Sequence, residues 1–305
     1  MTLYWICTQR KINKEGDFFL DNLICIYSVM RNNRPFINDI WSPEQVQAGW
    51  DRFESCKTFA DWEYLQENEK KLYSSSISYH PVDYSKVDSP ITKKDYRFQK
   101  IAECNSINFE ELLEKVTREQ SNAEFKEDRV SGERKSFDSD LEFLKNVGFA
   151  TTEEVKVVKV TEELFPELTN IVDQFDLDYC NTQLRYNLIG SMLHLHTDSC
   201  FGAWRNLEQL RDLPFNHVTK SPEGYYMFRI LIPLEDWQPG HVVGFEEEMW
   251  TWKAGDALVF DWANLKHYTC NLSFKSRYQF RITGVTTNPN HWLFDHINND
   301  KVKSL

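Results

Sequence analysis

Residues 182–198, TQLRYNLIGSMLHLHTD, hold the pattern that decides the fold: two β-type runs meet at Gly190 and end in His-x-Asp. Similar short runs follow, separated by Gly, Pro and Asp, at 225–237, 241–252, 256–262 and 277–287. Short strands with turn residues between them favour an antiparallel sandwich or barrel over βαβ units. The sequence contains neither GxGxxG nor GxxxxGK[ST], so it shows no nucleotide-binding loop.

Segments with helical character flank these runs. Ser42-Pro43 opens a predicted helix because Ser is a good N-cap and Pro suits the first helical position. Further helices are expected at 108–120, 140–149 and 162–175, and one more strand at 153–161. The predicted class is therefore mainly β with flanking helices (α+β).

Composition limits the functional classes. The 305 residues carry a net charge of −12, which disfavours a nucleic-acid-binding surface because such surfaces need clustered Lys and Arg. The seven cysteines are scattered and form no CxxC pair, which disfavours both a disulfide framework and a structural zinc site. No apolar run is long enough for a signal peptide or a membrane span. We expect a soluble cytoplasmic protein without a nucleic-acid or membrane partner; its oligomeric state is not readable.

His194, His196 and Asp198 alternate, so their side chains share one face if the segment is a strand. Non-haem iron sites use two imidazoles and one carboxylate on one side of the metal. At about 3.3 Å per residue, His196 and Asp198 are about 6.6 Å apart, whereas His194 and Asp198 are about 13 Å apart. His194 and His196 could also chelate a metal, but the carboxylate would then be unused. The spacing favours His196 with Asp198 and leaves His194 as a neighbour.

The third metal ligand is expected from a distant strand that faces the first. Gly255-Asp256 marks a turn, 257–262 is a buried strand, and His267 follows as that strand ends. The histidine after a Gly-Asp turn and an apolar strand strengthens the His-x-Asp signal.

Arg277 lies at the start of the last β-type run, ten residues after His267. A dicarboxylic keto acid bound to iron needs a cation at its far end, and Arg offers a bidentate fork for a carboxylate. Arg281 has the same strand parity and is the competing candidate. Arg229, in the run 225–237, could pair with an acidic residue instead of contacting the substrate.

Together these motifs resemble the iron(II)/2-oxoglutarate-dependent oxygenases, which have a double-stranded β-helix (jelly-roll, cupin-like) core. The resemblance covers about 150–286. Residues 228–284 are most similar to the aspartyl/asparaginyl β-hydroxylase branch, and the segment from Tyr186 to Asp198 resembles the prolyl hydroxylases. The animal aspartyl hydroxylases lack the carboxylate ligand that Asp198 would supply, so the resemblance does not extend to their substrate.

The resemblance implies that His196, Asp198 and His267 hold Fe(II) as the catalytic centre. It also implies that Arg277 binds the distal carboxylate of 2-oxoglutarate, and that Tyr186 adds a hydroxyl to that carboxylate. The expected activity is a dioxygenase that uses O₂ to hydroxylate a small molecule, an amino acid or a peptide or protein side chain, releasing succinate and CO₂.

Two other functions fit the same motifs: a different metal-dependent cupin enzyme, and a non-catalytic jelly-roll binding module. Arg277 favours the oxygenase over another cupin enzyme, because only a keto-diacid cosubstrate needs a cation at that depth of the site. The intact set of three ligands favours the oxygenase over a non-catalytic module, because a site without activity tends to lose a ligand. The predicted domains are a mixed α/β extension (1–149) that packs on or covers the site, a core (150–290) and a tail (291–305).

Overall fold

The computed structural model describes residues 44, 48, 51, 54–58, 60–61, 64, 89–93, 96–122, 126–127, 155–158, 160, 162–196, 198, 207–210, 212–216 and 221–305. These residues form mostly β-sheet with three longer helices. No helix among them is long and apolar enough to cross a membrane.

The main sheet has eight strands in the order β14-β1-β11-β8-β13-β4-β3-β2. In that order they are Lys303–Ser304, Phe98–Glu103, Asp256–Phe260, Tyr226–Pro233, Arg277–Thr286, Tyr179–Asn187, Val155–Val158 and Lys126–Glu127. All neighbours are antiparallel except β1 and β14.

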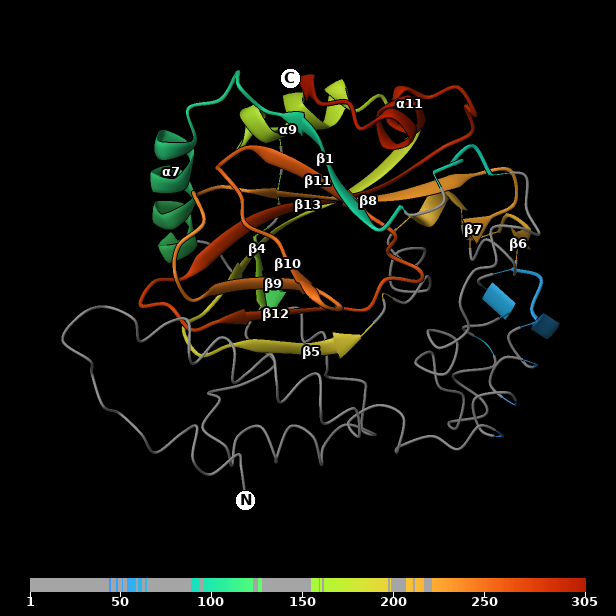
Figure 1. Cartoon of the computed structure of the whole chain (residues 1–305), viewed down its shortest axis with the longest axis horizontal. Coiled ribbons are helices and arrows are strands. Elements are labelled where there is room, and N and C mark those ends of the chain that lie inside the picture. Colours follow the sequence, from blue (N-terminus) through green and yellow to red (C-terminus); the bar gives the residue numbers. More distant parts are fainter. Residues whose placement is uncertain are drawn as a thin grey trace.

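A second, antiparallel sheet has the order β10-β9-β12-β5 and lies below the main sheet in Figure 1. Its strands are Glu248–Met249, His241–Phe245, His267–Asn271 and Met192–His196. A small third sheet pairs β6 (Phe215–Asn216) with β7 (Ser221–Pro222).

Three helices cover the other face of the main sheet (Figure 1). They are α7 (Phe109–Asn122), α9 (Pro166–Gln174) and α11 (Trp292–Asn299); a 3₁₀ turn, η3, spans Glu208–Leu210. The even-numbered residues of β13, such as Phe280 and Ile282, are fully buried in the core between helices and sheet. Each such apolar side chain stabilises the folded state by about 2 kcal/mol because it is removed from water.

The inner face of the main sheet differs between its two halves. On β11 the inward residues Leu258 and Phe260 join a second apolar core, which also contains Phe245 of β9. On β4 and β13 most inward positions are polar, including Asn187 and Arg277, which are cross-strand partners. The space between the two sheets is therefore apolar at one end and polar at the other.

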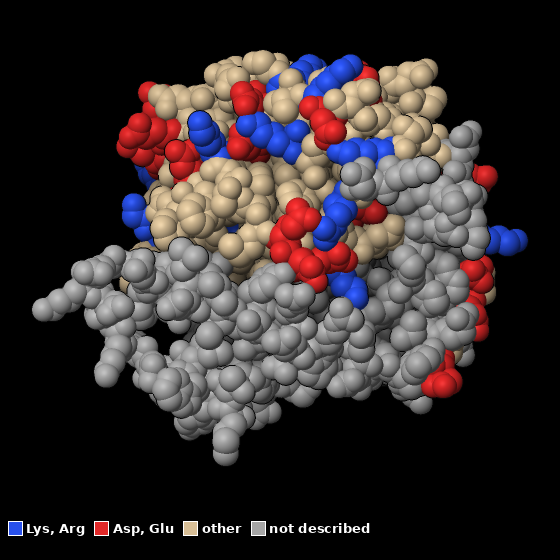
Figure 2. Space-filling view, in the orientation of Figure 1, with Lys and Arg blue, Asp and Glu red and all other residues tan. Residues whose placement is uncertain are grey.

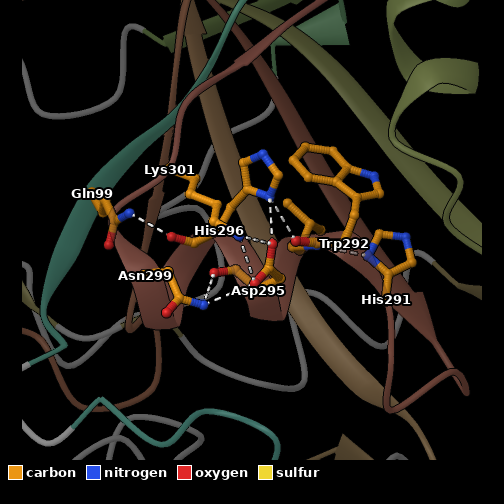
Figure 3. A network of polar contacts seen from close by, with 8 residues as sticks. Gln99, His291, Trp292, Asp295, His296, Asn299 and Lys301 are labelled. Carbon is orange, nitrogen blue, oxygen red and sulfur yellow. Dashed lines mark hydrogen bonds and ion pairs between the residues drawn. The ribbon is translucent and has the colours of Figure 1, made fainter.

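Helix α11 has polar contacts at both of its ends, and one of them joins it to the main sheet (Figure 3). His291 caps the helix, because its Nδ1 accepts a hydrogen bond from the backbone N–H of Leu293 at 3.2 Å. At the other end, Gln99 of β1 donates to the carbonyl of His296 at 2.8 Å. Lys301 pairs with Asp295 at 2.7 Å. The Gln99 contact ties the helix to β1, whereas the other two contacts lie within the C-terminal segment.

Several predicted elements are found, with altered boundaries. The expected helix at 108–120 is α7, and the strand at 153–161 includes β3. Pro166 does not interrupt the helix expected at 162–175, because α9 begins at this residue. Residues 44, 48 and 51 are helical, as expected for the segment after Ser42, whereas the helix expected at 140–149 lies outside the described residues.

The predicted domain limits remain a prediction, and most of 1–149 lies outside the described residues. β1 belongs to the predicted extension, yet it pairs with β11 of the predicted core. β14 of the predicted tail pairs with β1. All three predicted domains thus contribute to one sheet.

Candidate active site

The predicted metal ligands lie where β5 ends and β12 begins. His196 is the last residue of β5, and the backbone register pairs it with His267, the first residue of β12. His267 therefore opens a new strand after a turn at 262–264, instead of ending the strand before it. This strand is the hydrogen-bonded neighbour of β5 in one sheet and does not face it from another.

Asp198 follows β5 and is fixed by its backbone, since its N–H donates to the carbonyl of Trp262 at 3.2 Å. Its Oδ2 lies 3.7 Å from Nε2 of His267. The structure thus brings together two of the three predicted ligands. The side chains of His194 and His196 lie outside the described residues.

The ring of His267 is oriented for ligation. Its Nδ1 lies 3.1 Å from the carbonyl oxygen of Leu265, so the Nδ1–H tautomer donates there and leaves the Nε2 lone pair facing Asp198. Burial lowers the pKa of His267, which favours the neutral imidazole that binds metals. Phe260 packs edge-on against this ring, with centroids 5.0 Å apart.

Arg229 of β8 is 4% exposed and forms an ion pair with Oδ2 of Asp198. Its guanidinium also lies over the ring of Trp262, 5.9 Å from the centroid. The acidic residue that pairs with Arg229 is therefore Asp198, one of the predicted metal ligands. The guanidinium of Arg229 thus compensates the charge of this partly buried carboxylate.

The chemistry of these residues fits a divalent metal. An imidazole nitrogen and a carboxylate oxygen converge, and the second nitrogen of the ring is held by a carbonyl, as is usual around protein-bound metals. No three described His, Cys, Asp or Glu side chains form a metal-binding group, and the side chain of His196 is not among those described. His196 as the third ligand therefore stays a prediction.

Arg277, at the start of β13, is 1% exposed. It donates to the carbonyl of Val242 at 2.7 Å and to Oδ1 of Asn187 at 2.6 Å, and its Nε has no partner among the described residues. None of the described carboxylates forms an ion pair with it. Burial lowers the pKa of Arg277 to about 10, so a charged guanidinium is held where water does not compensate it.

Aromatic and acidic groups complete the surroundings of Arg277. Its guanidinium lies 5.9 Å from the ring centroid of Trp252, and His241 stacks on the same indole with centroids 6.4 Å apart. Burial, followed by the charge of Arg277, lowers the pKa of His241 to about 4. Burial also raises the pKa of Glu235, whose charge reaches Arg277. The sequence singled out neither Asn187 nor Trp252.

The structure does not bring Tyr186 to Arg277. Side chains alternate along β4, so Tyr186 faces the helices and stacks on Tyr278, with centroids 5.5 Å apart. The next residue, Asn187, takes the inward position beside Arg277. Strand parity counted from Arg277 would have identified Asn187, had the pairing of β4 with β13 been known.

Arg281 lies on the same face of β13 as Arg277 but is only partly buried, and it donates to Oε1 of Gln183 on β4. Its charge contributes to lowering the pKa of His267. The two arginines therefore occupy different parts of one polar space: Arg277 is enclosed, and Arg281 lies nearer the metal ligands.

No protein-family model and no curated protein matches the sequence. Solved structures with partly similar backbones include a prolyl-4-hydroxylase from Pseudomonas putida, with 14% identity, 64% of this chain and 95% of that one covered, and a TM-score of 0.34. A prolyl hydroxylase from Trichoplax adhaerens, in complex with a hypoxia-inducible-factor peptide, has 14% identity and a TM-score of 0.40, and the match covers 73% of this chain and 92% of that one. SnoN, an α-ketoglutarate-dependent epimerase of nogalamycin biosynthesis, has 12% identity and a TM-score of 0.40, and the match covers 69% of this chain and 88% of that one. Scores of this size establish neither a common fold nor a common activity.

Proposed function

We propose that the chain is an iron(II)- and 2-oxoglutarate-dependent oxygenase with a double-stranded β-helix core. His196, Asp198 and His267 would hold the metal, and Arg277 would bind the distal carboxylate of 2-oxoglutarate. The expected overall reaction converts substrate, O₂ and 2-oxoglutarate into hydroxylated substrate, succinate and CO₂.

The connections between the two sheets support the double-stranded β-helix. Along the chain, β4, β8, β11 and β13 of the main sheet alternate with β5, with β9 and β10, and with β12 of the second sheet. From β4 to β13 the chain thus passes repeatedly from one sheet to the other, as in jelly rolls. Asp198 contacts Arg229, an inward residue of β8, so Asp198 and Arg277 both lie at the space between the sheets.

The observation that carries the proposal is the buried charge of Arg277. Its two hydrogen bonds go to neutral oxygens, its Nε has no described partner, and burial disfavours its charged form. A buried guanidinium is strongly stabilised when a carboxylate arrives to pair with it. Because Asp198 and His267 lie in the same space, a dicarboxylic ligand of the metal accounts for both features.

Each residue has a defined task in this scheme. Asp198 and His267 present an oxygen and an Nε2 lone pair to the metal, and Leu265 fixes the tautomer. Arg277 orients the cosubstrate, and Asn187 orients Arg277. The bound iron would supply the activation of O₂, while the apolar residues around His267 exclude bulk water.

Succinate formation tests the proposal. Purified protein receives Fe(II), ascorbate, O₂ and 2-oxoglutarate, and succinate is measured with and without candidate substrates. His196→Ala should abolish succinate formation because it removes a metal ligand. His194→Ala is the matched control, since it removes a histidine two residues away that we do not assign to the metal. Succinate formation undiminished in the His196 variant would disprove the ligand assignment.

Metal binding provides an independent measurement. Titration with Ni(II) should show one site that is lost in Asp198→Ala and retained in His194→Ala. If Ni(II) binds but 2-oxoglutarate then shows no affinity, the alternative of another metal-dependent cupin enzyme is favoured. If neither binds, the non-catalytic jelly-roll module is favoured.

A further inference from the structure

A buried histidine between the two sheets has no hydrogen-bond partner for its ring among the described residues. His241, the first residue of β9, is 1% exposed, and both Nδ1 and Nε2 of its imidazole lack such a partner. The backbone of Lys275 is close enough to act on the pKa of this ring, although no hydrogen bond of normal geometry joins them. A neutral imidazole has one N–H to donate, and a buried donor that stays unpaired is costly. A ligand that accepts this hydrogen bond would remove the cost.

The position of His241 on β9 directs its side chain into the space between the sheets. Val243 and Phe245, which follow on the same strand, belong to the second apolar core in that space. Side chains alternate along a strand, so His241 points the same way. Its backbone is held on both sides, because its N–H donates to the carbonyl of Gln238 at 2.9 Å and its carbonyl accepts from Nε1 of Trp237 at 2.7 Å. These bonds fix the point from which the ring projects.

Arg277 lies close to this ring. Its guanidinium donates to the carbonyl of Val242, the residue that follows His241. Both groups lie against the indole of Trp252, which is itself fixed because its Nε1 donates to the carbonyl of Glu235 at 3.0 Å. Burial and the charge of Arg277 lower the pKa of His241 to about 4, so the ring is neutral at pH 7 and near enough to the guanidinium to interact with it.

Together the two side chains offer donors to one anion. Arg277 gives one N–H to Val242 and one to Asn187, and its Nε has no partner among the described residues. On the surface seen in Figure 2, lysine and arginine side chains lie beside acidic ones, whereas Arg277 is enclosed and both of these hydrogen bonds go to neutral oxygens. An arginine fork binds a carboxylate through two parallel N–H groups, and the carboxylate keeps lone pairs for a third donor.

The sequence predicts Tyr186 as this further donor to the distal carboxylate of 2-oxoglutarate, but the tyrosine faces the helices. We propose that His241 takes this part: its N–H binds the distal carboxylate together with Arg277, and it selects keto acids that carry such a carboxylate. This assignment rests on the proposed oxygenase function.

Gln279 is the competing donor. It lies two residues after Arg277 on the same face of β13, and its Nε2 also has no partner among the described residues. This places it about 6.6 Å along the strand from Arg277. His241, in contrast, adjoins the residue that the guanidinium contacts, and its ring shares Trp252 with Arg277. These contacts favour His241, and substitutions at both positions decide between the two.

Calorimetric titration of the Ni(II)-loaded protein with two keto acids tests the assignment. 2-Oxopentanoate has the same carbon chain as 2-oxoglutarate, with a methyl group in place of the distal carboxylate. His241→Phe keeps an aromatic ring against Trp252 and removes the N–H. We expect this variant to bind 2-oxoglutarate about ten- to a hundredfold more weakly, because a hydrogen bond to a charged group is lost. Its affinity for 2-oxopentanoate should stay unchanged, whereas a purely structural role of His241 would weaken both acids alike.

Three further variants complete the comparison. His241→Gln should retain most of the affinity for 2-oxoglutarate, because its side-chain amide again supplies an N–H. Gln279→Met removes the competing donor and should change neither affinity. His296→Phe is the matched control, since His296 lies on α11, which covers the other face of the main sheet (Figure 1). All variants are first compared with the wild type in thermal denaturation.

Nuclear magnetic resonance of the wild type observes the contact directly. The Zn(II)-loaded protein is labelled with nitrogen-15 in its histidines, and the signal of the His241 N–H is assigned by its loss in whichever His241 variant folds. 2-Oxoglutarate should shift this proton downfield, because it enters a charge-assisted hydrogen bond, and 2-oxopentanoate should not. This measurement decides if His241→Phe does not fold or if 2-oxopentanoate binds too weakly to be measured.

The outcomes separate this assignment from the oxygenase proposal. Equal weakening of both keto acids in His241→Phe, an unchanged affinity for 2-oxoglutarate, or a His241 signal that does not respond overturns the assignment. Loss of affinity in Gln279→Met with none in His241→Phe overturns it too and identifies Gln279 as the donor. If 2-oxoglutarate does not bind the wild type while glutarate shifts the His241 signal, the oxygenase proposal fails and the carboxylate receptor stands. If neither acid binds, both proposals fail.

Discussion

Replacing Arg277 by Met should leave the free protein about as stable as the wild type while removing its affinity for 2-oxoglutarate. Burial lowers the pKa of Arg277 from 12.5 to about 10. At about 1.4 kcal/mol per pKa unit, the desolvated charge disfavours folding by about 3 kcal/mol, and Met removes this penalty. The substitution also leaves Val242 O and Asn187 Oδ1 without their donor, at about 1–2 kcal/mol each. The two effects nearly cancel, so we expect a change of about 1 kcal/mol or less in the free energy of unfolding.

Binding should respond very differently. Two charge-assisted hydrogen bonds to a carboxylate contribute about 3–4 kcal/mol, which corresponds to a loss of affinity of about 10²- to 10³-fold. Urea denaturation of the metal-free protein measures the first quantity, and titration of the Ni(II)-loaded protein with 2-oxoglutarate measures the second. Arg118→Met, at an exposed position of α7, should change neither.

Two results would refute this reasoning. A loss of more than about 3 kcal/mol of stability in Arg277→Met would show that the guanidinium is an internal structural anchor, as in buried networks whose members depend on one another. An unchanged affinity for 2-oxoglutarate would show that another cation holds the cosubstrate.

Three further predictions concern other parts of the fold. Burial lowers the pKa of His241 to about 4 in the folded protein, so between pH 4 and 6.5 the unfolded chain binds more protons than the folded one. The free energy of unfolding should therefore fall by up to about 3 kcal/mol as the pH drops through this window. Urea denaturation of His241→Gln should show a flatter pH dependence than that of the wild type. A Cβ at position 244 would lie 2.1 Å from Cζ of Tyr268, so Gly244→Ala should lower the free energy of unfolding by about 1–3 kcal/mol; an unchanged urea midpoint would contradict this close packing. Burial raises the pKa of three described thiols to about 12, so a thiol reagent at pH 8 should modify them only after denaturation, and rapid labelling of the native protein at these positions would disagree. They are Cys104, Cys180 and Cys270.

The local patterns that the sequence predicted are those set by neighbouring residues. Short strands with turn residues between them, the helix α7 and the start of β13 at Arg277 all follow from periodicity or turn chemistry. The spacing of His196 and Asp198 singled out the segment that lies beside His267. These features need no information about which strands become partners.

The tertiary structure decided what depends on strand pairing. Tyr186 and Asn187 are adjacent in the sequence, and only the register of β4 against β13 puts the asparagine inside and the tyrosine against the helices. The same pairing explains why Arg185 and Arg281 meet at Gln183, although they come from strands almost a hundred residues apart.

The sequence by itself determined the β-rich class, the His-x-Asp segment and the position of Arg277, because these follow from local spacing. The tertiary structure decided that His267 starts a second-sheet strand, that Arg229 holds Asp198, and that Asn187 lies beside Arg277. The physical reason is that a shift of one residue in strand register moves every side chain of the strand to the opposite face of the sheet. Only non-local hydrogen bonding and packing fix that register.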